Sequence, residues 1–341
     1  MSQIDLAKIN AAAMVQMTDD EREVYLMDHP DSSEEIPVID ISGLRAGELG
    51  AREHVARQLH DVTENVGFFY LAGHGIPERL VADAFEHSRR FHALPLEVKR
   101  AIPYVSNDTF LSGYQAAGAA RAKKAAVNLI ADVKPNLLSK FSVNRETGGK
   151  PINMWPEALP GFREAVSEYH ARVEALGREL LPAWSVSLGL PPDWFDKFFE
   201  TPHVTLSMLH YPPQTEIGSR QYGIAPHTDN SFMTLLAQSN VGGLAVRMPS
   251  GHWRMVDKIP GTFLVNTGNL MVRWTNGRYL STKHRVINTA NVDRYSLPVF
   301  FGPSPDAVIE CAPTCCGPDN PPKYEPITYR DLRKWYYGSY D

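Results

Sequence analysis

Two kinds of hydrophobic spacing divide this chain of 341 residues. Between residues 51 and 190, apolar side chains recur three or four positions apart, which is the spacing along one face of an α-helix. After residue 203, the apolar positions fall in short runs that are β-branched or alternate with polar residues, separated by glycine, proline and asparagine. The order of these patterns predicts a helix-rich first half and a strand-rich second half.

Helical spacing is clearest in three segments, 51–66, 78–94 and 162–190. In the longest of them, apolar residues form one stripe that runs from Phe162 to Leu180. Pro182 lies within the same segment. Because proline removes a backbone donor and crowds the preceding turn, we expect the helix to kink or break there.

The rest of the first half is less regular. Segments 36–44 and 67–77 have the composition of short strands that run into turns. The residues before them are typical of a helical arm followed by a polar linker. The stretch 101–150 has the least readable pattern, and within it the segment GYQAAGAARAKKAAVNL (113–129) fits either a helix or a mobile loop.

Many short strands separated by turn residues predict a sandwich or a barrel. We therefore expect one α+β domain over residues 1–341, whose core is a jelly-roll-like barrel at 200–305. Residues 1–120 would form an N-terminal region of helices and strands, and residues 306–341 a C-terminal tail.

Composition and charge narrow the choice of partners. Hydrophobic residues make up 43% of the chain and charged residues 21%, which is ordinary for a soluble globular protein. Lys and Arg number 34 against 39 Asp and Glu, so the net charge of -5 gives no reason to expect a nucleic acid or an anionic membrane as partner. No signal peptide or membrane span is expected, because the apolar runs are too short. We expect a cytoplasmic protein.

The three cysteines, Cys311, Cys315 and Cys316, lie in one short segment. An odd number of cysteines in one loop is not a disulfide framework, and adjacent cysteines are awkward joint ligands for a metal. We therefore expect reduced thiols, which agrees with a reducing compartment such as the cytoplasm.

The segment IAPHTDNSFMTLL, residues 224–236, places two strong metal ligands beside an apolar run. His227 and Asp229 are two positions apart, and on a strand such residues point to the same face. His284 begins another strand-like run of the same block and can supply a third ligand. Two imidazoles and one carboxylate on one face of a metal form the triad of non-haem Fe(II) oxygenases. An H-x-D pair alone is common by chance, and a structural metal site is the alternative.

Arg294 and Ser296 follow His284 after a short turn-like segment. We expect the two runs to form a hairpin that brings Arg294 close to the metal, with Ser296 on the same face. An arginine and a hydroxyl make a planar, charge-matched cradle for a carboxylate. The alternative is an ordinary buried ion pair of Arg294 with Asp293 or Asp257.

The motifs of this chain, in their order, resemble those of the Fe(II)/2-oxoglutarate-dependent dioxygenases of the isopenicillin N synthase-like superfamily. They are IPVIDIS (36–42), GFFYLAGHGIP (67–77), LHYPPQ (209–214), H-T-D (227–229), the block from Gly242 to Tyr279, His284 and R-x-S (294–296). The likeness covers most of the chain. It implies a double-stranded β-helix framed by helices, in agreement with the jelly roll expected above.

The resemblance also implies an activity and a site. The enzyme would oxidise a small organic molecule, by hydroxylation, with Fe(II), O₂ and the cosubstrate 2-oxoglutarate, and would release succinate and CO₂. It implies no catalytic side chain beyond the metal ligands. The implied residues are His227, Asp229 and His284 for Fe(II), Arg294 and Ser296 for the distal carboxylate of 2-oxoglutarate, Tyr211 as a further contact to 2-oxoglutarate, and Phe300 beside the substrate.

Several alternatives stay open at this point. Leu209 departs from plant members, which often have asparagine there, and this removes one implied contact to the cosubstrate. An isopenicillin N synthase-type oxidase or cyclase would work without 2-oxoglutarate, and a desaturase or an ethylene-forming enzyme is a nearer variant. A catalytically silent carboxylate-binding protein is a different class, against which the intact triad argues. For Tyr211 and Phe300, plain core packing is the alternative. The primary substrate and the oligomeric state are not indicated.

Overall fold

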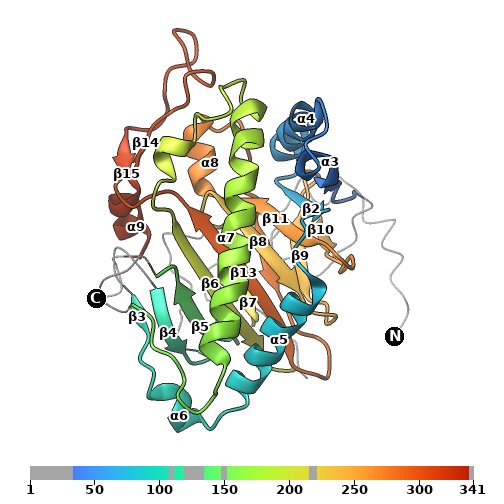
Figure 1. Ribbon diagram of the computed structural model, residues 1–341, viewed down its shortest axis with the longest axis vertical. Helices are drawn as coiled ribbons and strands as arrows, with labels where there is room; N and C mark the ends of the chain where they lie inside the picture. Colours follow the sequence, from blue (N-terminus) through green and yellow to red (C-terminus); the bar gives the residue numbers. More distant parts are fainter. Residues whose placement is uncertain (1–33, 107–110, 119–133, 147–151, 215–220, 338–341) are drawn as a thin grey trace, which may run out of the picture.

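Residues 34–106, 111–118, 134–146, 152–214 and 221–337 are described by a computed structural model (Figure 1). The expected N-terminal arm lies outside these residues, and so does part of the 101–150 stretch. The described parts of that stretch contain three strands. Most of the segment 113–129, expected as a helix or a loop, lies outside the described residues, and its first three residues belong to a strand instead.

The larger of two facing sheets has nine strands and carries most of the protein core. Only its first pair is parallel; the other neighbours are antiparallel. In sheet order the strands are β1 (Val38–Asp40), β2 (Phe68–Ala72), β11 (Phe263–Thr267), β8 (Met233–Gln238), β13 (Arg294–Gly302), β6 (His203–Tyr211), β5 (Ser139–Asn144), β4 (Leu111–Gln115) and β3 (Val105–Ser106).

The smaller sheet has four antiparallel strands: β10 (Trp253–Met255), β9 (Leu244–Arg247), β12 (His284–Val286) and β7 (Ile224–His227). Apolar side chains from both sheets form one cluster between them, which includes Phe68, Tyr211, Leu244 and Val286. Two sheets that close on a shared interior form the double-stranded β-helix, so the structure agrees with the expected fold class.

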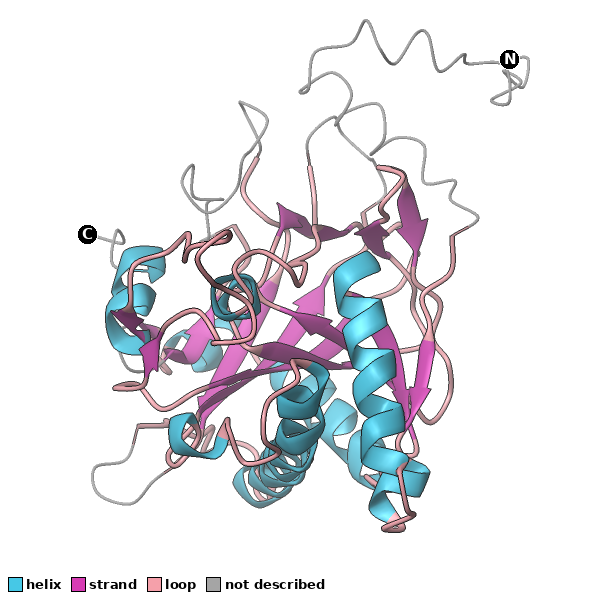
Figure 2. Cartoon of the chain, turned by 90° about the horizontal axis from the view of Figure 1, so that it is seen from above, coloured by secondary structure: helices cyan, strands magenta, loops and turns pink. Residues whose placement is uncertain are grey.

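Helices α4 (Ala51–Asn65), α5 (Glu78–His92) and α7 (Phe162–Ser187) pack on the outer face of the larger sheet, and the long α7 crosses in front of it (Figures 1 and 2). Alternate residues of a strand face opposite sides, so Val204 and Leu206 of β6 join the cluster under the helices, while Leu209 and Tyr211 face the interior. The helices are α3 (Ser42–Arg45), α4 (Ala51–Asn65), α5 (Glu78–His92), α6 (Leu96–Arg100), α7 (Phe162–Ser187), a 3₁₀ turn at Asp196–Phe198, α8 (Asn269–Trp274) and α9 (Tyr329–Tyr337).

Pro182 does not break helix α7, which runs on to Ser187, so of the two expected outcomes the break is not observed. Proline inside a helix costs roughly 3 kcal/mol. Leu181, Ala183 and Trp184 beside it are all buried in the cluster between the helices and the larger sheet. Packing of that face stabilises the last turns enough to offset the lost hydrogen bond.

The segment from His284 to Arg294 is also arranged differently from the expected hairpin. Strand β12 pairs with β7 and β9 in the smaller sheet, whereas β13 pairs with β6 and β8 in the larger one. The chain therefore crosses from one sheet to the other between these strands. Arg294 approaches the interior because the two sheets face each other, not because of a turn.

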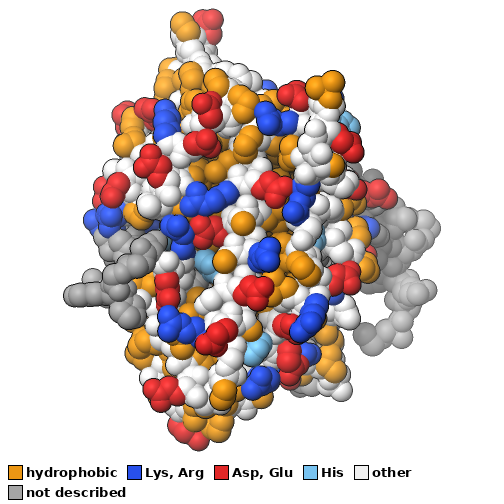
Figure 3. Space-filling model, viewed as in Figure 1, with side chains coloured by type: hydrophobic (Ala, Val, Ile, Leu, Met, Phe, Trp, Pro, Cys, Tyr) orange, Lys and Arg blue, Asp and Glu red, His pale blue; other side chains and the backbone are white. Residues whose placement is uncertain are grey.

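Positive and negative side chains are interspersed on the face that α7 and α5 cover (Figure 3). Among the described residues, no helix combines the length and the apolar character that crossing a membrane requires. The C-terminal part adds a small ribbon of β14 (Val308–Ile309) and β15 (Ile327–Thr328) next to α9.

Candidate metal centre

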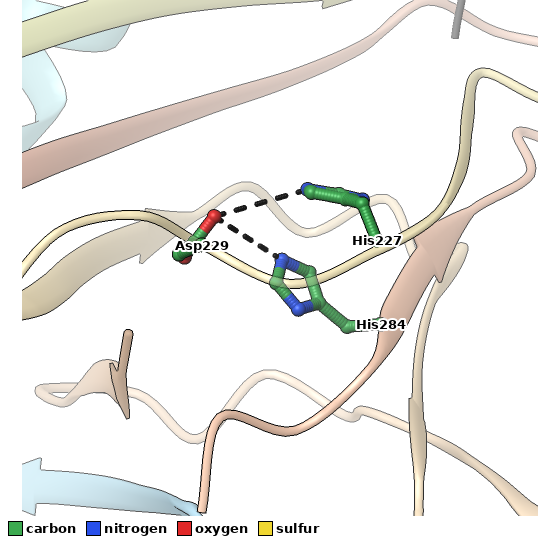
Figure 4. A group of neighbouring side chains, drawn as sticks. All are labelled: His227, Asp229 and His284. Carbon is green, nitrogen blue, oxygen red and sulfur yellow. Dashed lines mark ion pairs between the residues drawn. The ribbon is translucent and has the colours of Figure 1, made fainter. Parts of the chain in front are cut away.

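His227, Asp229 and His284 converge in the interior between the sheets (Figure 4). His227 and His284 are direct cross-strand partners on β7 and β12, and their ring centres lie 4.2 Å apart. The Nε2 atom of each imidazole is 3.8 Å from Oδ1 of Asp229. One ligand atom from each residue lies within 4.8 Å of the others, and no further group of three such side chains occurs in the described parts of the chain.

One step of the sequence argument was wrong, although the residues do meet. Strand β7 ends at His227, so Asp229 lies in the loop beyond the strand and not on its face. Its backbone carbonyl accepts a hydrogen bond from the amide of Asn269 at 2.8 Å, at the start of α8. The loop is thus held by β7 before Asp229 and by the start of α8 through this hydrogen bond. The two attachments place the carboxylate next to the imidazoles.

The hydrogen bonds of the two imidazoles fix which nitrogen faces the centre. Nδ1 of His227 lies 2.9 Å from the carbonyl oxygen of Ala225, and Nδ1 of His284 lies 3.2 Å from that of Thr282. A carbonyl oxygen only accepts, so Nδ1 carries the proton in both rings. Both Nε2 lone pairs therefore face Asp229, which is the arrangement that metal-binding histidines adopt.

Burial lowers the pKa of His227 to about 4, and the neighbouring His284 acts in the same direction. Metal ligation requires a neutral imidazole. Burial alone would raise the pKa of Asp229, but the two imidazoles and the hydrogen bonds from Asn266 and Thr234 outweigh it and lower that pKa. At neutral pH, His227 therefore offers a neutral nitrogen and Asp229 an ionised carboxylate.

Arg294 lies in the same interior, nine-tenths or more buried, and burial lowers the pKa of its guanidinium. Its Nε and Nη1 atoms have no hydrogen-bond partner in the described structure. The alternative of an ion pair with Asp293 is not observed, since that carboxylate pairs with His210 instead, at 2.8 Å. A buried guanidinium with unused donors suits a carboxylate ligand.

Tyr211 and Ser296 flank this arginine. The guanidinium carbon of Arg294 lies 4.8 Å from the centre of the Tyr211 ring. Burial raises the pKa of Tyr211, against the opposing effects of the Arg294 charge and of hydrogen bonds from Ser296 and Arg294. The three side chains form one polar cluster where β6 ends and β13 begins.

All seven residues singled out from the sequence line one cavity, which encloses about 60 Å³. Leu209, the departure from the plant pattern, also lines it. Its remaining walls are mostly apolar: Phe68, Ile224, Leu236, Leu244, Val286 and Pro298. A larger cavity of about 310 Å³ lies between α5 and the ends of β8 and β11, and it contains none of the seven.

Two lining residues were missed by the sequence analysis. Thr234 on β8 donates a hydrogen bond to Oδ2 of Asp229 at 2.6 Å, and Asn266 on β11 donates one to the same oxygen at 2.8 Å. Both are polar residues inside the apolar runs FMTLL and FLVNT. A polar residue at an inward position of a buried strand was the available signal.

The cysteines play no part in this site. Cys311, Cys315 and Cys316 are free thiols in a loop next to α8, as expected. Burial raises the pKa of Cys311 to about 12, so it is an unreactive thiol at neutral pH.

Two histidines and one carboxylate that converge inside a double-stranded β-helix are the donor set and the fold of non-haem iron oxygenases. Comparison with known proteins agrees. Residues 36–158 match the family described as non-haem dioxygenase in morphine synthesis N-terminal, and residues 202–303 match the 2OG-Fe(II) oxygenase superfamily.

Individual relatives extend this likeness over most of the chain. The chain is 36% identical to the 2-oxoglutarate-Fe(II) type oxidoreductase hxnY of Emericella nidulans, over 87% of either protein. It resembles the structure of a full-length Neurospora crassa protein in complex with alpha-KG and thymine, with a TM-score of 0.82 and 27% identity, over 92% of this chain and 100% of that one. JOX2 in complex with 2OG, Fe and JA gives a TM-score of 0.74 and 26% identity, over 90% and 88%.

The chain therefore belongs to the 2OG-Fe(II) oxygenase superfamily. It is a 2-oxoglutarate-dependent non-haem iron dioxygenase that uses Fe(II), 2-oxoglutarate and O₂. The relatives named for 2-oxoglutarate, and the solved structures that contain it, support this activity and not the oxidase alternative.

Proposed function

We propose that His227, Asp229 and His284 bind the iron of this dioxygenase. The observation that carries the proposal is the convergence of two Nε2 lone pairs and one carboxylate oxygen within 4.8 Å. When bound, the iron with 2-oxoglutarate and O₂ supplies the oxidising chemistry, which yields succinate, CO₂ and an oxidised substrate. The protein contributes the ligand geometry and a cavity that excludes water.

Arg294, with Ser296 and Tyr211, is proposed to hold the distal carboxylate of 2-oxoglutarate. The support is a buried guanidinium with two unused donors, in the cavity that the three proposed iron ligands also line. The guanidinium carbon lies over the Tyr211 ring, 4.8 Å from its centre, at a distance suited to a cation–π contact. A carboxylate would satisfy the donors and remove the cost of leaving them unpaired.

The primary substrate is proposed to be a small organic molecule that is uncharged and apolar where it meets the iron. If Arg294 binds 2-oxoglutarate, no other cationic side chain lines the cavity within the described residues. Phe300 and Phe68 are proposed to line the substrate side, because aromatic rings suit a flat or apolar molecule. Relatives were solved with thymine and with JA, which are small organic molecules.

Hydroxylation of a C–H bond is the proposed outcome, and a cytoplasmic location is proposed from the free thiols. The test measures O₂ uptake and succinate with Fe(II), with and without 2-oxoglutarate, on a panel of small heterocyclic and aromatic molecules that includes thymine. One succinate per hydroxylated product is expected. Product formed without 2-oxoglutarate would contradict the proposal and support an oxidase that does not use this cosubstrate.

A further inference from the structure

The two carboxylate oxygens of Asp229 are used differently. Oδ1 faces both imidazoles, at 3.8 Å from each Nε2 atom (Figure 4). Oδ2 faces away from them and accepts two hydrogen bonds, from Oγ1 of Thr234 at 2.6 Å and from Nδ2 of Asn266 at 2.8 Å. Oδ1 therefore points to the position of the metal, and Oδ2 binds to two side chains of the larger sheet.

Both donors come from a rigid part of the fold. Thr234 and Asn266 are cross-strand partners on β8 and β11, in the interior of the larger sheet, and each is only 3% exposed. Asp229 itself lies in a loop. The carboxylate is thus oriented by two neighbouring strands and not by its own backbone.

The two hydrogen bonds also use all the lone pairs with which Oδ2 can accept a bond. A carboxylate oxygen has about two lone-pair sites, and two donors at these distances use both. The amide of Asn266 cannot be turned around, since a carboxylate oxygen accepts and only Nδ2 can donate to it. Coordination of a metal through both oxygens of Asp229 would require breaking at least one of these bonds.

We propose that Thr234 and Asn266 are positioning residues that restrict Asp229 to metal coordination through Oδ1 alone. This keeps a coordination position open that a chelating carboxylate would fill. The inference rests on the proposed iron site. It assigns to two residues of the sheet a role in deciding how many positions remain for 2-oxoglutarate and O₂.

The chain offers a matched control for Thr234. Thr205 on β6 and Thr234 on β8 pair with Phe300 from its two sides, so they occupy equivalent places in one row of the sheet. Thr205 is 2% exposed, and its hydroxyl donates to Oδ1 of Asn144 at 2.8 Å. Threonine-to-valine changes at the two positions remove the same group, but only one of them touches Asp229.

The experiment titrates Fe(II), and separately Co(II), into the metal-free protein without O₂. Thr234→Val and Asn266→Leu are expected to weaken Fe(II) binding about 10- to 100-fold, as is usual for residues that orient a metal ligand. They should also change the visible absorption of bound Co(II), because this absorption reports coordination number and geometry. Thr205→Val and the conservative Thr234→Ser should bind both metals as the unchanged protein does.

Two results would overturn the inference. Unchanged Fe(II) affinity and Co(II) absorption in Thr234→Val and Asn266→Leu would show that the two donors do not control coordination. Equal loss in Thr205→Val would show a general effect of the removed hydroxyl. If Thr234→Val does not fold, Asn266→Leu and Thr234→Ser still decide the question.

A further arm separates this inference from the proposed site. Asp229→Ala should abolish metal binding. If Asp229→Ala binds Fe(II) normally, the iron site itself is wrong and the inference falls with it. If Asp229→Ala loses the metal while Thr234→Val and Asn266→Leu keep normal affinity and absorption, only the positioning role fails.

Discussion

Arg294 on β13 and Tyr211 on β6 are direct cross-strand partners, with the guanidinium carbon 4.8 Å from the centre of the Tyr211 ring. The guanidinium is buried, and the Nε and Nη1 atoms of Arg294 have no hydrogen-bond partner in the described residues. A cation held in this way is pre-oriented for a two-point contact with a carboxylate.

The first prediction concerns this arginine. Arg294→Gln should raise the KM for 2-oxoglutarate at least about thirtyfold, since truncating one partner of a buried charge pair costs roughly 2–5 kcal/mol. Arg294→Lys should restore only part of the affinity, because an ammonium cannot form the planar fork. Steady-state kinetics with 2-oxoglutarate varied would measure both. A variant that instead weakens only primary-substrate binding would contradict the assignment.

The second prediction separates the two faces of β13. Phe300 lines the cavity, whereas Phe301 packs on the outer face, where it stacks on Phe199. Phe300→Ala should change substrate affinity or product distribution more than the KM for 2-oxoglutarate. Phe301→Ala should lower the free energy of unfolding by about 3–5 kcal/mol and leave substrate selectivity unchanged. Similar losses of selectivity in both variants would argue that Phe300 is only part of the core.

The third prediction follows from two buried histidines. Burial lowers the pKa of His92 to about 3, helped by nearby His210, and that of His170 to about 4. The ordinary value is 6.5, so the unfolded chain takes up protons first as the pH falls. The stabilising contribution is therefore complete above about pH 6.5 and is lost as the pH falls toward 4.

Urea unfolding at pH 7 and pH 4.5 measures this loss. The drop in the free energy of unfolding between these values should be about 2 kcal/mol smaller in His170→Gln than in the unchanged protein. Glutamine can still donate to the carbonyl of Val204, which His170 contacts at 3.2 Å. An identical pH dependence in both proteins would mean that His170 does not titrate as argued.

The fourth prediction concerns Gly177 in helix α7. A β-carbon at this position would lie 2.8 Å from the ring of Phe301 on β13. Alanine usually stabilises a helix relative to glycine by about 1 kcal/mol. Here the contact should reverse the sign, and Gly177→Ala should destabilise the fold by about 1–3 kcal/mol.

Ala175 provides the control, since it is exposed on the same helix. Ala175→Gly should cost about 1 kcal/mol by propensity alone. Differential scanning calorimetry of both variants would compare them. Stabilisation by Gly177→Ala would show that the helix and the sheet can move apart at no cost.

The sequence was informative where one pattern repeats over many residues. The helices expected at 51–66 and 78–94 agree closely with α4 and α5, because their apolar faces are long and regular. The strands β4 and β5 within 101–150 were missed, since Leu111–Gln115 lacks alternation and Ser139–Asn144 contains only two apolar residues. Their structure depends on pairing with β6 and its neighbours, which local pattern does not encode.

The site shows the same limit. His227, Asp229 and His284 were found as residue types at suggestive spacing, and they meet as expected. The roles of Thr234 and Asn266 could not be assigned from the sequence. Both bind Oδ2 of Asp229, which lies in a loop outside their strands, and only the folded structure brings the three side chains together. Arg294 lies near the proposed metal ligands as expected, but not through a hairpin, since the strands of His284 and Arg294 belong to different sheets.

The central claim is that His227, Asp229 and His284 bind the iron of a 2-oxoglutarate-dependent dioxygenase. The most direct measurement is anaerobic Fe(II) titration of the metal-free protein and of Asp229→Ala, followed by succinate formation from 2-oxoglutarate after O₂ is admitted. The account predicts one Fe(II) per chain and Fe(II)-dependent succinate in the unchanged protein, with both lost in a folded Asp229→Ala variant. Full iron binding and full succinate formation in Asp229→Ala would contradict it.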